Sequence, residues 1–148
     1  MVRGARPRSP PVALVVDSGP LYAYVDAADP DHDACRALLE ESSGPLVVPT
    51  LTIAEAAYLL ATRLGAEPEL RFLGDLAAGT LAVEPVHPAD WLRIADLVGR
   101  YRDLPLGTVD ASVVAVAERL AVTTIATLDR RHFAVVRPSH ADAFELLP

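Results

Sequence analysis

Four carboxylates of this chain stand where an apolar segment starts or ends. Asp17 directly follows the apolar run VALVV, and Asp129 follows a second such run, VTTIATL. Glu55 and Asp110 lie close to the starts of two segments with helical patterns, TLTIAEAAYLLATRLG and TVDASVVAVAERLA. In a parallel sheet, ligands bind beyond the carboxyl ends of the strands, so we expect these four side chains to converge there. Converging carboxylates repel one another unless cations are present, and ligand sets made of oxygen suit Mg²⁺ or Mn²⁺.

Two of these acids also have structural explanations that involve helix capping. Asp17 can cap the helix that follows Gly19, although Ser18 can serve in the same way. Thr52 and Glu55 have the spacing of a capping box, in which two side chains satisfy the backbone at a helix start. From the local sequence alone, both explanations stay open beside a role in metal binding.

The other two acids have structural explanations as well. Asp110 lies in the predicted first turn of its helix, where a negative charge interacts favourably with the helix dipole and where Thr108 can cap the helix. Its neighbours are apolar, so this helix is expected to pack deeply, and a partly buried carboxylate is costly unless it is paired or coordinated. Asp129 follows a strand and has the residue type of a turn. The joint placement of all four acids favours a shared cation site over four separate structural roles.

The elements that would position these acids alternate along the chain. Apolar strands are predicted at residues 12–16, 46–49, 80–86, 122–128 and 143–148. Helices are predicted at residues 19–27, 29–42, 50–65, 68–79, 88–103 and 108–121. The helix at 88–103 is amphipathic, and its apolar face is predicted to contain Trp91, Ile94, Leu97 and Val98. Alternating strands and helices predict right-handed crossovers. The predicted fold class is therefore α/β, a three-layer α/β/α sandwich with a central, mostly parallel five-stranded sheet.

Composition and charge restrict the class of protein. Residues 1–11 are rich in Arg and Pro and are predicted to be a disordered tail, which leaves residues 12–148 as one domain. The single cysteine, Cys35, excludes an internal disulfide and favours a reducing, cytoplasmic compartment. No apolar run reaches the ~20 residues needed to cross a bilayer, so no membrane association is expected. A net charge of -7 is not typical of a nucleic-acid binder, although a metal site counted without its metal contributes to such a balance.

Two residues that are missing from the sequence disfavour two other classes of parallel-sheet protein with clustered aspartates. A phosphoacceptor receiver domain needs a lysine near its phosphorylated aspartate, and this chain contains no lysine. A phosphatase of the haloacid-dehalogenase type needs a second aspartate two residues after the first, and that position is Gly19.

The sequence resembles the PIN-domain family and, within it, the VapC toxins of bacterial toxin–antitoxin pairs. The segments that carry the resemblance are VVDSGPLYAY, TIAEAAYLLATRLG, LPLGTVDASVVAVAERL and TIATLDRRHFAVVRP, and they span most of the chain from Val12 onward. The resemblance implies an α/β/α sandwich and a metal-dependent endoribonuclease that cleaves structured RNA, either transfer or ribosomal RNA, and thereby inhibits translation. It also implies a VapB-type antitoxin as partner, a homodimer, and Mg²⁺ as the cofactor, with Mn²⁺ as an alternative.

By this resemblance the acidic site maps onto Asp17, Glu55, Asp110 and Asp129. We expect Asp17 and Asp110 to be the main direct ligands. Asp129 is expected to bind through a water or to hold a second metal. Glu55 is expected to orient the attacking water or to complete that second site. Many family members carry a further acid shortly before the Asp-Ala pair; here that position is Gly107, and no role is assigned to the nearby acid at position 103.

Several neighbouring residues are expected to support this site. Ser18 and Thr127 are candidates for hydrogen bonds that orient the metal ligands. Arg130, Arg131 and Arg137 follow the last acid closely in sequence and are candidates for RNA binding, because RNA needs a local basic rim despite the negative net charge.

The four histidines are scattered along the sequence and are expected to be exposed, so no zinc site is predicted. His132, which is close to Asp129 in sequence, is a candidate for contact with substrate. A different class of function also stays open: a PIN-like module that binds a protein or RNA partner through its acidic cleft without cutting. Retention of all four acids favours the nuclease, since a binding module has no need of them.

Overall fold

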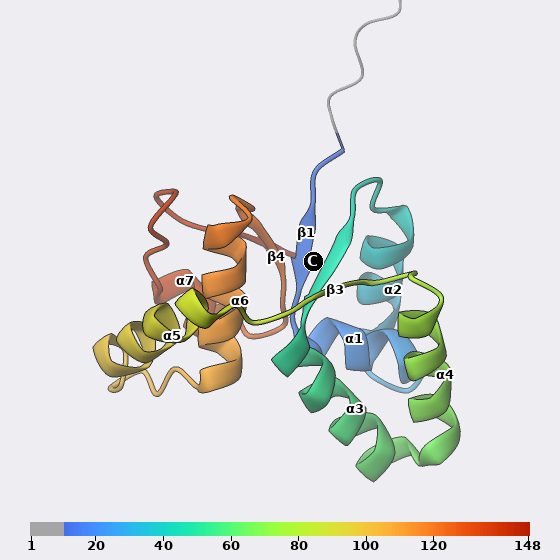
Figure 1. Cartoon of the computed structure of the whole chain (residues 1–148). Helices are drawn as coiled ribbons and strands as arrows, with labels where there is room; N and C mark the ends of the chain where they lie inside the picture. Colours follow the sequence, from blue (N-terminus) through green and yellow to red (C-terminus); the bar gives the residue numbers. More distant parts are fainter. Residues whose placement is uncertain (1–10) are drawn as a thin grey trace, which may run out of the picture.

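The five strands form one parallel sheet at the centre of the molecule. The computed structural model describes residues 11–148, so the predicted N-terminal tail lies almost entirely outside the described residues. The strands are β1 (Leu14–Val16), β2 (Leu46–Pro49), β3 (Ala82–Glu84), β4 (Thr124–Ala126) and β5 (Glu145–Leu147). Their order across the sheet is β3-β2-β1-β4-β5, and every neighbouring pair is parallel (Figure 1). The predicted parallel sheet is confirmed.

Helices cover both faces of this sheet. The helices that correspond to predicted segments are α1 (Ser18–Val25), α2 (His32–Glu41), α3 (Thr50–Leu64), α4 (Ala66–Ala77), α5 (Pro88–Arg100) and α6 (Thr108–Arg119). A further helix, α7 (Arg130–Val135), is absent from the prediction, because so short a segment shows too few apolar positions to reveal a helical period. Figure 1 shows α1 to α4 on one side of the sheet and α5 to α7 on the other.

Alternation along β1 divides the core into two halves. Leu14 and Val16 pack in a cluster with Leu60 of α3, whereas Val15 packs in a second cluster with Val113 of α6. Because successive side chains of a strand point to opposite faces, a strand covered on both faces is a continuous apolar run, as VALVV is. The predicted three-layer α/β/α arrangement is confirmed.

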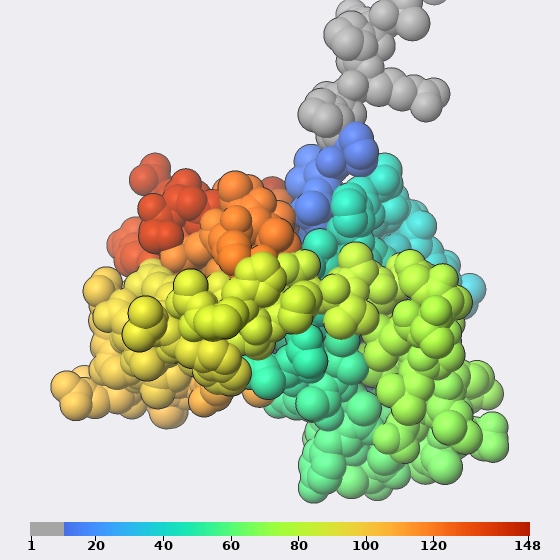
Figure 2. Space-filling model, in the orientation of Figure 1, coloured from blue at the N-terminus to red at the C-terminus, as the bar shows by residue number. Residues whose placement is uncertain are grey.

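One edge of the sheet collects the ends of strands and the starts of helices. β1 leads directly into α1, β2 leads directly into α3, and β4 leads into α7 through a short loop. Figure 2 shows that the surface is hollowed along its lower edge, between the green layer that contains α3 and α4 and the yellow to orange layer that contains α5 and α6. Residues that follow β1 and β4 therefore meet residues near the starts of α3 and α6.

The predicted apolar face of α5 is correct at its centre and wrong at Trp91. Ile94 and Leu97 are buried in the core, and Val98 is half-buried. Trp91 is 49% exposed, because the buried face of α5 passes through Asp90, Ile94 and Leu97, and Trp91 lies one position away from that face. Across residues 11–148, no helix combines the length and the apolar character that spanning a membrane requires.

Candidate metal centre

Asp17 is held at the end of β1 by two hydrogen bonds to its side chain. The carboxylate accepts from the backbone N–H of Ser18 at 2.8 Å and from the Thr127 hydroxyl at 2.9 Å. Asp17 is thus the N-cap of α1, in agreement with its structural explanation, and it is only 4% exposed. Burial, with smaller contributions from the charges of Asp110 and Glu55, raises the pKa of Asp17 to about 7 against the lowering effect of these hydrogen bonds. The buried Asp17 carboxylate at the end of β1 is therefore unfavourable in its ionised form unless a cation binds it.

Glu55 reaches the same place from α3, but without a capping box. The helix begins at Thr50, as predicted, and its N-cap is Pro49, which forms no side-chain capping bond. The Thr52–Glu55 capping box that the sequence left open is therefore absent. Thr52 is fully buried, and its hydroxyl has no hydrogen-bond partner within the described chain. Glu55 is exposed and accepts a hydrogen bond from the Ser18 hydroxyl at 3.0 Å. This contact ties the start of α1 to α3.

Asp110 lies in the first turn of α6, as predicted. The N-cap of this helix is Gly107, and Thr108, the predicted cap, is already helical. Burial is the largest influence on the Asp110 carboxyl and raises its pKa; contact with His132 acts in the opposite direction, and the charge of Asp129 raises the pKa again. Asp110 is thus a second carboxylate whose ionised form is only partly solvated.

Asp129 and His132 enter the site together from α7. Asp129 is the N-cap of α7 and accepts a hydrogen bond from the His132 backbone N–H at 3.2 Å. The His132 ring lies between two acids, with Nδ1 2.8 Å from Asp129 Oδ2 and 2.9 Å from Asp110 Oδ2. The expectation that the histidines are exposed is wrong here, as it is for His32 and His140, which are also partly buried. The spacing of Asp129 and His132 was a usable signal, because side chains three residues apart meet at a helix start.

The four acids face one open cleft of about 460 Å³. We call the following residues the acidic cluster: Asp17, Glu55, Asp110 and Asp129. Ser18, Gly19 and Leu128 complete the lining of the cleft. Within residues 11–148, no arginine forms an ion pair with the acidic cluster, and His132 is its one potentially cationic contact. Carboxylate oxygens that are partly buried and lack a cation, with one imidazole beside them, are a donor set that fits a divalent metal ion.

Thr127 and Ser18 each join two members of the acidic cluster. The Thr127 hydroxyl donates to Asp17 and accepts from the backbone N–H of Asp129 at 3.0 Å. Ser18 uses its backbone N–H for Asp17 and its hydroxyl for Glu55. The structure thus brings both residues that were candidates for orienting the acids into direct contact with them.

The three arginines that are candidates for RNA binding are all exposed. Arg130 and Arg131 are the first residues of α7 and directly follow Asp129 at the cleft, whereas Arg137 lies beyond the end of α7. Asp103 is exposed in the turn after α5 and does not line the cleft, so it does not replace the further acid of the family pattern.

Comparisons with known proteins agree on one family. The PIN domain family matches residues 14–137. Ribonuclease VapC26 of Mycobacterium tuberculosis is 39% identical over 135 residues, which cover 91% of this chain and 100% of that protein. The crystal structure of Mycobacterium tuberculosis VapC20, described as a sarcin-ricin loop cleaving toxin, has a TM-score of 0.78 at 19% identity and covers 91% of this chain and 99% of its own. The crystal structure of VapBC2 from Rickettsia felis, bound to a DNA fragment from their promoter, has a TM-score of 0.65 at 12% identity, with coverage of 91% and 97%. The two solved structures share the fold of this chain. The family match and the sequence relative each extend over most of the chain. The chain therefore belongs to the PIN domain family and, within it, to the VapC toxins.

Proposed function

We propose that this protein is a divalent-metal-dependent endoribonuclease that cleaves structured transfer or ribosomal RNA and so inhibits translation. The observation that carries the proposal is the acidic cluster, whose carboxylates share one open cleft and have no arginine partner in the described chain. Burial of an unpaired carboxylate is unfavourable, so a purely structural role does not account for this arrangement. A bound divalent ion does account for it.

The names of similar proteins support the same class of reaction. The sequence relative is named a ribonuclease, and the VapC20 structure is described as that of a toxin that cleaves the sarcin-ricin loop. We carry ribonuclease activity and a structured RNA substrate from these proteins to this chain. A VapB-type antitoxin, in keeping with the VapBC2 structure, and a second copy of the chain are the protein partners that we infer.

The members of the acidic cluster differ in burial, and we infer different tasks for them. Bound Mg²⁺ or Mn²⁺ supplies a nucleophile at neutral pH and neutralises charge that develops on the phosphate. Asp17 and Asp110 are the more buried acids and serve as the main ligands, because a rigid carboxylate binds without reordering. Asp129 completes the ligand set. Glu55 is exposed at the mouth of the cleft, where it can orient the attacking water and accept its proton.

The remaining residues of the site orient the acids and the substrate. Hydrogen bonds from Ser18 and Thr127 fix the carboxylate rotamers, as outer partners of metal ligands commonly do. Arg130 and Arg131 are exposed and directly follow Asp129, which lines the cleft, and Arg137 extends the positive charge past α7. Their guanidinium groups pair with backbone phosphates and so hold the RNA in position for in-line attack.

The test is cleavage of total bacterial RNA by purified, antitoxin-free protein with Mg²⁺ or Mn²⁺, with the cut ends mapped by sequencing. Asp110→Asn removes one ligand charge and keeps the side-chain size, and EDTA removes the ion. Asp33→Asn is the matched control, because Asp33 also lies in the first turn of a helix but is exposed and outside the cleft. We expect discrete cuts from the wild type and Asp33→Asn, and none from Asp110→Asn or in EDTA.

Cleavage that persists in Asp110→Asn and in EDTA contradicts the proposal. Absence of cleavage by the folded wild-type protein also counts against it. That result favours a module that binds a partner through the acidic cluster without cutting.

A further inference from the structure

One ring nitrogen of His132 faces two carboxylates at once. Nδ1 lies 2.9 Å from Asp110 Oδ2 and 2.8 Å from Asp129 Oδ2. A ring nitrogen carries at most one hydrogen, so it cannot donate a full hydrogen bond to both acids. Without that hydrogen, the nitrogen lone pair faces two anionic oxygens. A hydrogen bond alone therefore leaves this contact only partly satisfied, whereas a cation between the three atoms would satisfy all of them.

The distances between these atoms match those between ligands of one metal ion. Neighbouring ligands on an octahedral ion with bonds of about 2.1 Å lie about 3.0 Å apart, by simple geometry. Both of the distances from His132 Nδ1 are close to this value. Ligand atoms of Asp110, Asp129 and His132 all lie within 4.8 Å of one another, so one ion can contact all three.

The position of His132 is set by the fold. Phe133, the next residue of α7, is 1% exposed and anchors this short helix in the core. The His132 backbone N–H also bonds Asp129 Oδ1 at 3.2 Å, which keeps the ring beside that acid. The ring is therefore held in place before any ion arrives, as expected for a ligand on a rigid element.

We infer that His132, through Nδ1, is a direct ligand of the divalent ion together with Asp110 and Asp129, and that this nitrogen ligand makes the site favour Mn²⁺ over Mg²⁺. The inference rests on the proposed metal-dependent function. Its chemical basis is ligand type: Mg²⁺ prefers oxygen, whereas imidazole suits transition-metal ions. The consequence is a metal preference that the four carboxylates alone would not produce.

The test is Mn²⁺ binding to the purified full-length protein, followed by electron paramagnetic resonance. Electron spin-echo modulation detects a nitrogen nucleus bound directly to Mn²⁺, and ¹⁵N-histidine labelling identifies that nitrogen as a histidine nitrogen in the wild type. His132→Gln removes the ligand. His87→Gln is the matched control, because the His87 side chain is 48% exposed and lies outside the cleft.

We expect a histidine nitrogen coupling in the wild type and in His87→Gln, and no such coupling in His132→Gln. Mn²⁺ affinity should fall at least about tenfold in His132→Gln, since loss of even an outer partner of a ligand typically has that effect. Mg²⁺ affinity should fall by a smaller factor, so that the preference for Mn²⁺ is reduced.

Three outcomes overturn the inference. Bound Mn²⁺ without histidine coupling in the wild type shows that His132 is not a ligand and leaves the proposed function intact. An equal fall in Mn²⁺ and Mg²⁺ affinity in folded His132→Gln shows a positioning role only. Folded wild-type protein that binds neither ion contradicts the inference and the proposed function together.

Discussion

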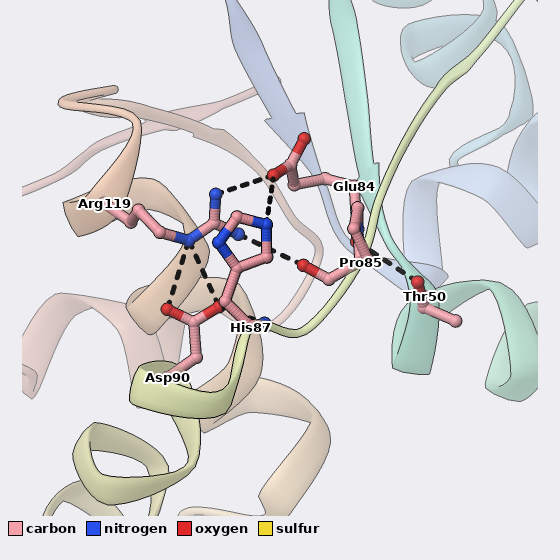
Figure 3. A network of polar contacts seen from close by, with 6 residues as sticks. All are labelled: Thr50, Glu84, Pro85, His87, Asp90 and Arg119. Carbon is pink, nitrogen blue, oxygen red and sulfur yellow. Dashed lines mark hydrogen bonds and ion pairs between the residues drawn. The ribbon is translucent and has the colours of Figure 1, made fainter.

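Acidic side chains have opposite surroundings in the acidic cluster and in the ion-pair network around Arg119. Arg119, at the end of α6, binds Asp90 through Nε at 3.1 and 3.2 Å and Glu84 through Nη1 at 2.6 Å. Its Nη2 donates to the carbonyl of Pro85 at 3.1 Å, and the His87 backbone N–H donates to Asp90 at 2.8 Å (Figure 3). We call these five residues the Arg119 network. Every carboxylate in it has a cationic partner.

The two regions show how the fold separates stability from chemistry. Asp90 in the Arg119 network is 5% exposed, about as buried as Asp17 in the acidic cluster at 4%. Asp90 accepts hydrogen bonds from a guanidinium and from the backbone at the start of α5. Arg119 also binds Glu84 of β3, so the Arg119 network connects β3, α5 and α6. Within the described chain, Asp17 receives hydrogen bonds but no positive charge, and burial raises its pKa. At equal burial, Asp90 therefore forms a structural ion pair, whereas Asp17 has no cationic partner within the described chain.

Removal of the charge of Asp17 should have the strongest effect on the acidic cluster. Asp17→Asn should reduce RNA cleavage by about 10³-fold or more, equivalent to about 4 kcal/mol of barrier, because a main ligand is lost. Its free energy of unfolding in EDTA at pH 8 should be equal to or higher than that of the wild type, since an unfavourable buried charge disappears. Cleavage rates test the loss of activity, and urea unfolding of the same preparations tests the change in stability. Normal activity, or collapse of the fold, would remove the distinction between the two regions.

The second prediction addresses the Arg119 network. Arg119→Met should lower the free energy of unfolding by about 3 kcal/mol, because it leaves Asp90 and Glu84 without their partner. Cleavage per folded molecule should stay close to that of the wild type. Urea unfolding provides the measurement. Arg36→Met is the matched control: Arg36 pairs with Glu40 in an exposed position and should contribute less than about 1 kcal/mol. Equal effects of the two substitutions would argue against a structural role for the Arg119 network.

The third prediction concerns pH. The pKa of Asp17 is raised from 3.8 to about 7 in the folded protein, mainly by burial. Between these values the folded protein holds a proton that the unfolded chain releases, so the stability from this group falls as pH rises from about 4 to about 7 and is constant above. The expected fall is on the order of 4 kcal/mol, because each pKa unit corresponds to about 1.4 kcal/mol. Urea unfolding in EDTA across this range measures it as the difference between the wild type and Asp17→Asn.

Added Mn²⁺ should offset this fall, because the ion binds the ionised carboxylate and stabilises the folded protein where pH is high. If the free energy of unfolding in EDTA depends on pH in the same way for the wild type and Asp17→Asn, burial does not destabilise the ionised Asp17 carboxylate.

The weakest effect is expected from the two arginines that begin α7 and directly follow Asp129. Arg130→Gln with Arg131→Gln should weaken binding of RNA to the inactive Asp110→Asn protein. The slope of log affinity against log salt should decrease by about 1 for each phosphate that the protein no longer neutralises. Salt titration of RNA binding measures that slope. Arg71→Gln, at an exposed position of α4, is the control. An unchanged slope in the double variant would mean that Arg130 and Arg131 do not hold RNA.

Much of this architecture is readable from the sequence because it depends on local periodicity. VALVV and LVVP are apolar on consecutive residues, which is the pattern of strands covered on both faces, and each lies in a predicted strand. TIA, which is buried at all three positions, also lies in a predicted strand. The acids at the ends of these segments follow from the same pattern, because parallel strands end at one edge of a sheet. For that reason the sequence alone predicts that the acidic cluster converges.

The partners of these side chains lie far away in sequence, so local patterns do not reveal them. The hydrogen bond from Thr127 to Asp17 spans 110 positions, and the one between His132 and Asp110 spans 22. The spacing of Thr52 and Glu55 allowed a capping box, whereas the helix begins two residues before Thr52 and Glu55 accepts a hydrogen bond from Ser18 of another helix. Strand and helix periods are local, so the sequence alone predicts that the four acids meet at the sheet edge, although not that His132 joins them from α7. The tertiary structure decided which carboxylates gain a cation and which stay unpaired, because charge pairing depends on distance in space.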